Sequence, residues 1–378
     1  MKAIYTNLRA CLMVVLLLLF PWLSGLSAEG TPVKKYRFTE LLTIGVGEAG
    51  EEKEEPYQFY NIIGIDCDKE GNIYVLDYNA VNVKKFDRSG NFIRQYFRKG
   101  KGPDEISNAF SIVINKYTDH MFILQDFGFT LKEFDLDGNY IAYHILPRQF
   151  FSVIYFLEKE RCIYMNSVPK KDKYHNFHVL NIAQKKIVKE FALIQIPHVL
   201  NFKQYFTIAG DSVLWTSLGN EMKLLAFDLK TGKKVQEIQI PGEYRENKIL
   251  ETVIREDSRM VTPILYNVAQ PFVIDDQLFT MVIIQDYRKK NGKIQKFPVS
   301  WKRIIYRVDG SRFVRLGILD DSEDMYVATV SKNRLILFAN DPYSRIKILE
   351  FSSTDDSKTN GLPMPGEGKV LKRKPILQ

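Results

Sequence analysis

A pattern of about 48 residues recurs along this chain, and it restricts the possible folds more than any other feature of the sequence. The segment 64–93, GIDCDKEGNIYVLDYNAVNVKKFDRSGNFI, is similar to the segment 113–141, VINKYTDHMFILQDFGFTLKEFDLDGNYI. Matching residues lie 48 or 49 positions apart in the two segments: Asp77 and Asp126, Phe86 and Phe134, Gly90 and Gly138. A fixed period of this size is typical of folds assembled from one repeated supersecondary unit.

Each copy contains four short runs of β-branched and aromatic residues, which are typical of strands. The turns between the runs carry Gly, Asn and Asp, and Gly-Asn pairs supply the positive φ that tight hairpins need. In the first copy the runs cover residues 62–67, 73–76, 81–86 and 92–97. Four antiparallel strands within fifty residues form one blade of a β-propeller.

Weaker copies follow and bring the number of blades to six. They cover residues 150–191, 205–240, 271–317 and 325–351, and the last copy ends one strand short. The N-terminal segment 35–52 resembles only the end of a blade, an outer strand followed by a Gly-x-Gly corner. We therefore predict an all-β, six-bladed β-propeller of four-stranded antiparallel blades. In this prediction an N-terminal strand, at about residues 35–46, completes the last blade and closes the ring, which hides free strand edges.

The first 28 residues are typical of a secretory signal peptide. Lys2 and Arg9 precede an uninterrupted apolar run at 11–20, Pro21 ends the run, and small residues lead to Ala28. A membrane anchor is disfavoured, because about 20 apolar residues are needed to span a bilayer and this run is half as long. We predict a signal peptide at 1–28, a propeller at 33–352 and a polar, basic tail at 353–378. The protein is then exported to the periplasm or the extracellular space, with no membrane span after cleavage.

The charge and the cysteines restrict the partners. A net charge of +8 is compatible with nucleic acid or an acidic surface as a partner, but an exported protein rarely meets nucleic acid, so we predict no nucleic-acid partner.

Beyond the signal peptide only Cys67 and Cys162 remain, in different predicted blades. We predict that both are buried free thiols and that packing, not disulfides, holds the core. We expect a monomer.

The motif of the first copy resembles a known family. The stretch GNIYVLDYNAVNVKKFDRSGNF, followed by GKGPDEI, resembles the NHL-repeat-like six-bladed β-propeller family of exported bacterial proteins. The resemblance is strongest across 64–141 and partial at 226–233 and 306–313. The third copy departs from it by lacking the Phe-Asp-x-x-Gly hairpin, and the fifth by a basic insertion.

Polar residues stand at or just before the six predicted inner strands, whose starts face the central channel. These candidates for ligand binding in the channel are Asn61, Asn108, Gln149, Gln204, Asn267 and Glu323. Amide and carboxylate oxygens are suitable ligands for Ca²⁺, and the resemblance implies that gluconolactonase- and paraoxonase-like hydrolases hold a divalent ion in such a ring. Here only Glu323, with Asp324 beside it, is acidic. Glu323 is therefore a weak candidate metal ligand, and we predict no cofactor, with Ca²⁺ left as a possibility. A channel mouth that is polar because water fills it stays an alternative.

Two further groups of residues have candidate roles. Asp77 and Asp126 recur once per copy, so we predict turn-capping carboxylates that accept backbone N–H bonds, not catalytic acids. The insertion of the fifth copy is a candidate partner-contact loop, because long loops on a rigid scaffold often carry recognition. Its basic residues, which suit an anionic cell-surface polymer, are Arg288, Lys289, Lys290 and Lys293.

Three functions remain open. The leading hypothesis is an exported, non-catalytic propeller that binds a protein, peptide or glycan partner on one face. The alternative is a divalent-metal-dependent hydrolase or lactonase-like enzyme with its site in the central channel. A lyase acting on sugars or peptides would need a Tyr, His or Arg in the channel. A propeller fold does not decide among them.

Overall fold

The computed structural model describes most of the predicted repeats. The chain divides into two units, and one of them, Phe38–Phe351, holds the sheets apart from the first three residues of β1 and the last three of β30. The described residues are 35–45, 55–147, 154–165, 175–193, 206–218, 221–240, 252–254, 261–263, 267–286, 289–290, 293–294, 300–321, 325–340 and 344–354. The predicted signal peptide and most of the predicted tail lie outside them, so these boundaries stay predictions.

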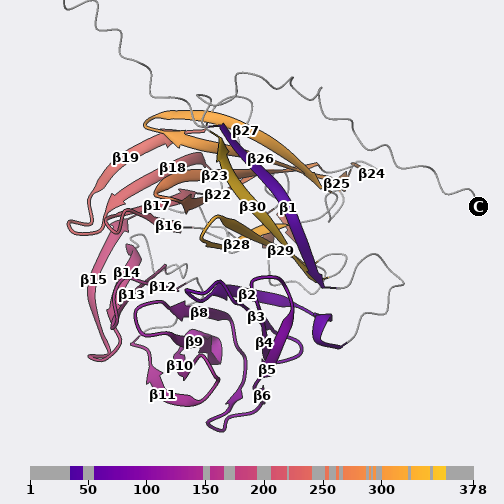
Figure 1. Cartoon of the computed structure of the whole chain (residues 1–378). Helices are drawn as coiled ribbons and strands as arrows, with labels where there is room; N and C mark the ends of the chain where they lie inside the picture. Colours follow the sequence, from indigo (N-terminus) through magenta and orange to yellow (C-terminus); the bar gives the residue numbers. More distant parts are fainter. Residues whose placement is uncertain are drawn as a thin grey trace, which may run out of the picture. The chain divides into compact units, whose positions relative to one another are not determined.

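Six four-stranded antiparallel sheets form the fold, and each is one blade (Figure 1). The first three blades follow the chain from inner to outer strand: β2 (Ile62–Cys67), β3 (Ile73–Asp77), β4 (Asn82–Phe86) and β5 (Phe92–Tyr96); β8 (Ser111–Asn115), β9 (His120–Gln125), β10 (Thr130–Asp135) and β11 (Tyr140–Ile145); β12 (Ile154–Phe156), β13 (Arg161–Met165), β14 (His175–Asn181) and β15 (Lys186–Leu193). The all-β, six-bladed prediction is confirmed.

The fourth and fifth blades follow the same order, whereas the sixth takes its outer strand, β1, from the N-terminal part of the chain. These three blades are β16 (Phe206–Ala209), β17 (Val213–Leu218), β18 (Glu221–Asp228) and β19 (Lys234–Gln239); β22 (Asn267–Ile274), β23 (Gln277–Asp286), β26 (Ser300–Asp309) and β27 (Arg312–Asp321); β28 (Tyr326–Ser331), β29 (Arg334–Ala339), β30 (Arg345–Thr354) and β1 (Lys35–Gly45). Three two-stranded pairs and two 3-10 turns lie in the connections: β6 (Arg98–Lys99) with β7 (Glu105–Ile106), β20 (Thr252–Ile254) with β21 (Val261–Pro263), β24 (Lys289–Lys290) with β25 (Lys293–Ile294), η1 (Glu55–Tyr57) and η2 (Asp126–Gly128).

The two ends of a blade carry different connections. The inner strand begins at one end, which we call the leading end, and the link between the second and third strands lies there too, as the pairing of Ile62 with Asp77 shows. The hairpin between the third and outer strands lies at the other end, which we call the trailing end. Among the described residues, no helix is long and apolar enough to cross a membrane.

The core lies between neighbouring blades, because each blade is apolar on both faces. In β9, Ile123 packs with Leu76 and Val83 of the first blade, whereas Phe122 packs with Tyr164 of the third. Strands buried on both faces read as continuous apolar runs, and β3 is buried at every position.

Both cysteines outside the first 28 residues are buried and free, as predicted. Cys67 lies in the core between the first and last blades and Cys162 in the core between the second and third blades. Burial raises the pKa of both thiols, that of Cys162 to about 12. Because the thiolate is the reactive form, these side chains act as small apolar residues.

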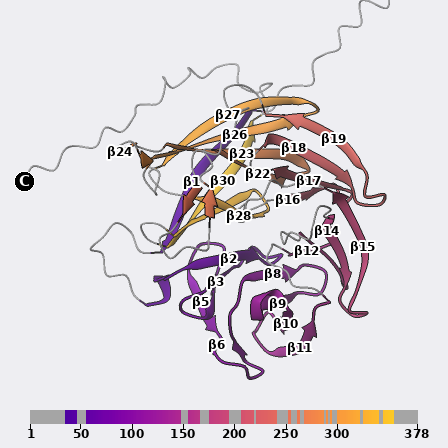
Figure 2. The ribbon, with the colours of Figure 1, turned by 180° about the vertical axis from the view of Figure 1, so that it is seen from behind.

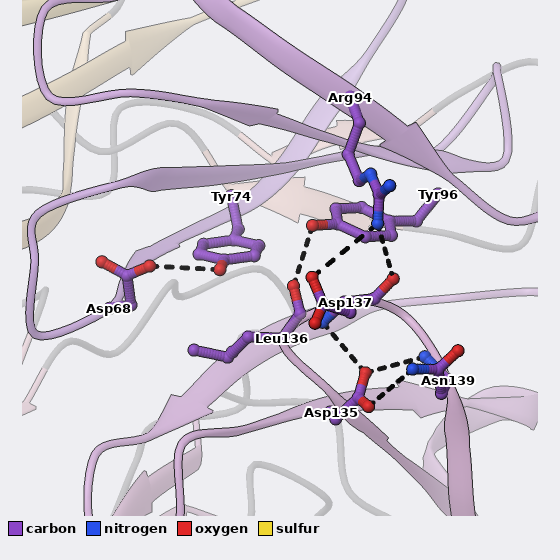
Figure 3. Close-up of polar contacts among 8 residues, drawn as sticks. All are labelled: Asp68, Tyr74, Arg94, Tyr96, Asp135, Leu136, Asp137 and Asn139. Atoms are coloured by element: carbon purple, nitrogen blue, oxygen red, sulfur yellow. Dashed lines mark hydrogen bonds and ion pairs between the residues drawn. The ribbon is translucent and has the colours of Figure 1, made fainter.

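The hairpin glycine of the repeat touches the preceding blade. Gly138 has φ +89°, and a Cβ there would strike the ring of Tyr96 on β5, whose hydroxyl donates to the carbonyl oxygen of Leu136 at 2.9 Å (Figure 3). Asp135 closes the same turn by accepting from the backbone and the side chain of Asn139 at 2.8 and 2.7 Å. Glycine is therefore required here for both its φ and its missing side chain.

The N-terminal strand β1 pairs with β30 as the outer strand of the last sheet, and Figures 1 and 2 show the two side by side from both directions. Gly90 lies against Leu42 and Ile44 of β1 as Gly138 lies against β5. The first and last blades are also joined at Ile62, whose backbone N–H and carbonyl bond the Asn340 side chain at 2.8 and 2.7 Å. These contacts support closure of the ring by β1, which stays a prediction tested below.

Candidate functional site

The structure describes three of the six candidate channel residues. Asn61 directly precedes β2, and Asn267 is the first residue of β22. Asn108 precedes β8, with an exposed side chain and φ +46°. All three backbones lie at leading ends. Gln149, Gln204 and Glu323 lie outside the described residues, so a ring of six polar side chains stays a prediction.

Asp77 organises the leading end of the first blade. Its buried carboxylate accepts hydrogen bonds from four backbone N–H groups, those of Tyr60, Asn61, Asn79 and Ala80, at 2.7–3.2 Å. Two donors belong to the link after β3 and two to the segment that leads into β2. One carboxylate therefore fixes both loops, as the turn-capping interpretation predicted.

Asp126 occupies the equivalent position in the second blade but has different partners. Its carboxylate accepts from the hydroxyl groups of Ser107 at 3.5 Å, Thr130 at 2.9 Å and Tyr143 at 3.3 Å. Asp126 itself has φ +52° and is the first residue of the 3-10 turn η2. The prediction of backbone capping is thus correct for Asp77 and wrong for Asp126, which binds side chains.

Exposed aromatic side chains lie in the loops next to these two aspartates. Tyr60, Tyr78 and Phe129 are 60%, 39% and 47% exposed. The Tyr78 ring packs on Phe110, with ring centroids 6.4 Å apart, and Phe110 belongs to the link between the first two blades. We call these four residues the aromatic patch. The sequence pattern did not identify it, because exposure of a loop aromatic depends on how each turn is fixed.

A third carboxylate, that of Asp66, joins three inner strands. It lies on β2 and accepts from the Ile114 backbone N–H of β8 at 2.8 Å and from the Thr329 hydroxyl of β28 at 3.2 Å. Burial raises the pKa of Asp66, although the charge of Lys116 and these hydrogen bonds oppose the change. After desolvation, the charge of Asp66 also contributes to the raised pKa of Tyr155, about 12. Asp66 holds the inner strands together, a role that an isolated Asp in a strand-like run does not reveal.

Two buried lysines, one repeat period apart, each bind the link that leads into their blade. Desolvation lowers the pKa of both ammonium groups. Each donates, at 2.5–3.3 Å, to two backbone carbonyl groups of the link that precedes its blade: Lys84 to Glu55 and Gln58, and Lys132 to Gly102 and Glu105. The repeat could have indicated these two lysines as equivalent positions, since they are 48 residues apart in the sequence.

The basic insertion lies between the second and third strands of the fifth blade. Lys289–Lys290 and Lys293–Ile294 form the two short strands β24 and β25. Because this link follows β23, it belongs to the leading end, like the aromatic patch in its own blades. Arg288 lies outside the described residues, and the role of the loop in partner contact stays a prediction.

One group of titratable side chains lies away from the leading ends. Glu133 on β10 bonds His120 of β9 and His144 of β11, at 2.7 and 2.8 Å. Partial burial raises the pKa of Glu133, but the hydrogen bonds from His144 and His120 outweigh it, and the pKa is lowered. In the part of the chain that the structure describes, no three His, Cys, Asp or Glu side chains are grouped to hold a metal ion.

Comparisons with two known structures show the same fold, and a third structure is less similar. A member of the DUF4221 family from Bacteroides vulgatus has a TM-score of 0.57 at 10% identity, covering 85% of this chain and 99% of that one. A protein from Bacteroides fragilis that is named as exported has a TM-score of 0.55 at 12% identity, covering 84% and 95%. The virginiamycin B lyase of Staphylococcus aureus has a TM-score of 0.45 at 11% identity, covering 84% and 99%. At these identities the likeness concerns the fold alone.

The sequence comparisons reach the same architecture. The sequence matches no curated protein. The NHL-type resemblance of the repeat motif stays a prediction. Over residues 57–218 the chain matches the model of the DUF5128 family, which is described as a 6-bladed beta-propeller.

Proposed function

We propose that this protein is exported and binds a protein, peptide or glycan partner at the leading ends of its blades, without catalysis. The observation that carries the proposal is the aromatic patch of the first two blades. Tyr60 and Phe129 expose about half of their surface or more. Exposed rings supply large, rigid contact area for apolar side chains or sugar rings at a small cost in conformational entropy.

The polar groups around the patch favour binding over catalysis. The carboxylates of Asp77 and Asp126 accept hydrogen bonds that fix the loops carrying the rings. A preformed surface loses less entropy when a partner binds. The exposed amide of Asn108 lies between the two blades and offers both a donor and an acceptor.

Export rests on the sequence of residues 1–28, with a periplasmic or extracellular destination. The basic hairpin of the fifth blade is a second candidate contact at a leading end. Lys289, Lys290 and Lys293 supply positive charge there, which suits an anionic polymer.

The test is binding to immobilised oligosaccharide and peptide libraries, with two alanine variants as probes. Tyr78→Ala and Phe129→Ala are expected to weaken any retained ligand at least tenfold, about 1.4 kcal/mol. Tyr117→Ala is the matched control, because Tyr117 is 47% exposed in the turn between β8 and β9, at the trailing end. Equal losses in all three variants, or no ligand in either library, would count against the proposal.

The alternative, a divalent-metal-dependent hydrolase or lactonase-like enzyme, depends on Glu323. It predicts thermal stabilisation by micromolar Ca²⁺, because an ion that binds only the folded state raises the melting temperature. Glu323→Gln should then abolish the stabilisation. If the stabilisation persists in that variant, Glu323 is not the ligand.

A further inference from the structure

The outer strand of the second blade differs from every other outer strand in its charge. Strand β11, with the sequence YIAYHI, carries no Lys, Arg, Asp or Glu. The other outer strands all carry formal charges, as β5 (FIRQY), β15 (KIVKEFAL), β19 (KVQEIQ), β27 (RFVRLGILDD) and β1 (KYRFTELLTIG) show. Charged residues on an edge strand prevent pairing with another chain, so β11 lacks a protection that the other five have.

The same strand exposes an unusual amount of apolar surface. Thirteen large hydrophobic side chains are exposed among the described residues, and four of them lie in β11: Tyr140, Ile141, Tyr143 and Ile145. The strands β1, β5, β15 and β19 contribute one each. Ile145 is the most exposed of the four, at 64%. Clustering of this kind marks an interaction surface, whereas single exposed apolar residues need no explanation.

Polar side chains of other outer strands bind the next blade. Arg94 of β5 donates to the Asp137 carbonyl oxygen at 3.2 Å, as Figure 3 shows. Lys189 of β15 donates to the carbonyl of Leu229 at 2.7 Å, and Gln236 of β19 to that of Gly310 at 3.0 Å. The sequence of β11 contains no Lys, Arg, Gln or Asn that could do the same, and the side chains of Tyr143 and His144 bond Asp126 and Glu133 of their own blade.

The backbone of β11 is open to a further strand. β11 is the last strand in its sheet, so among the described residues one row of its N–H and C=O groups has no neighbouring strand on the outer side. Such an edge is a template for an added antiparallel strand. An uncharged sequence with high β-propensity favours this addition.

We propose that β11 pairs antiparallel with β11 of a second copy of this chain, in a two-fold dimer centred on Tyr143. In a two-fold pair of identical strands, each residue lies opposite the same residue, or a residue close to it in sequence, of the other copy. Charged residues on such a strand would therefore lie near equal charges of the partner strand. β11 avoids that repulsion. With this centre, Tyr143 lies opposite its copy, a favourable cross-strand pair. Ile145 faces Ile141 of the partner, the residue at which β11 shifts its register against β10. The proposal replaces the expectation of a monomer and is independent of the proposed function.

The dimer is expected to be weak. Five paired residues bury less than the roughly 1,200 Å² of a standard interface, so a dissociation constant in the micromolar range or above is expected. The first experiment is sedimentation velocity of the exported protein over a wide concentration range. Ile145→Lys should weaken the dimer about tenfold or more, because the two-fold axis introduces two charges at once. Val235→Lys is the matched control, since Val235 is 57% exposed on β19.

A second experiment tests the register. Tyr143→Cys should form a disulfide-linked dimer under mild oxidation, because directly opposite residues have Cβ atoms about 5 Å apart. Val235→Cys should react much more slowly, and the native thiols of Cys67 and Cys162 are buried. Melting temperatures show whether each variant is folded.

Three results would overturn the proposal. One is a monomer at every concentration, with Tyr143→Cys and Val235→Cys cross-linking at the same rate. Another is a dimer that Ile145→Lys leaves intact, which would place the interface elsewhere. The third is slow labelling of monomeric Tyr143→Cys: if a soluble reagent reaches its introduced thiol far more slowly than that of Val235→Cys, the chain itself covers β11.

Discussion

Blades one and two have the same framework but different surfaces. Both carry a buried lysine that binds the preceding link, and both close the outer hairpin with an Asp–Asn pair and a glycine at positive φ. They differ in the partners of Asp77 and Asp126, and in their outer strands β5 and β11. Positions inside the blade therefore repeat because every blade packs on its neighbours in the same way. Positions at the leading end and on the outer strand face solvent and are free to diverge.

The largest expected difference between the two blades concerns their aspartates. Asp77→Ala should lower the free energy of unfolding by about 3–4 kcal/mol, because it leaves four partly buried backbone N–H groups without their acceptor. Asp126→Ala should cost about 1 kcal/mol, since its hydroxyl partners can turn to water or other acceptors. Urea unfolding of both variants measures the difference. Equal losses would show that the two carboxylates contribute equally to stability.

The hairpin glycines test whether β1 packs against the hairpin of the first blade as β5 packs against that of the second. Gly138→Ala and Gly90→Ala should each cost about 2–3 kcal/mol, because the added methyl meets Tyr96 or Leu42 in addition to the strained φ. Gly310→Ala isolates the backbone cost of about 1 kcal/mol, since Gly310 has φ +58° and nothing within 4 Å of its Cβ position. Chemical unfolding compares the three. A cost for Gly90→Ala equal to that of Gly310→Ala would place β1 away from Gly90 and refute closure of the ring.

The buried lysines should be equivalent. Lys84→Met and Lys132→Met are each expected to cost about 1–2 kcal/mol, because methionine keeps the apolar stem but leaves two carbonyl groups without a donor. Lys85→Met is the control, since Lys85 is the next residue on β4 and is only partly buried. Thermal unfolding gives the comparison. If only one of the two substitutions lowers stability, the lysines do not contribute equally in the two blades.

The smallest expected effect is the acid sensitivity of the two hairpin aspartates. Partial burial raises the pKa of Asp87 and Asp135, but hydrogen bonds from Asn91 and Asn139 outweigh it and lower both values. The unfolded chain then takes up protons first, so stability is lost as pH falls from about 4 through the folded pKa.

Melting temperatures between pH 7 and pH 3 measure this loss. The double variant Asp87→Asn with Asp135→Asn should show a shallower decline than the native protein. Equal slopes would assign the acid sensitivity to other carboxylates, such as Glu133.

The sequence predicts the framework well and the surfaces poorly, for a physical reason. Turn chemistry and alternation are local, so the six blades, the strand limits of the first copy and the role of Asp77 follow from neighbouring residues. The buried position of Lys84 depends on a link that arrives from another blade. Asp126 differs from Asp77 because hydroxyl groups at Ser107 and Thr130 approach it. Exposure of Tyr60 and Phe129 likewise depends on contacts between segments distant in sequence.

The pairing of β1 with β30 has a consequence for how this chain folds after synthesis. The strand β1 is made early and cannot pair until β30 has been made, so the final blade is completed only after all the other strands have been synthesised. Pairing between such distant segments is slow to form and leaves intermediates with open strand edges. We expect the protein to depend on chaperones that hold incomplete chains for longer than does a fold whose first strand pairs with its neighbour in sequence.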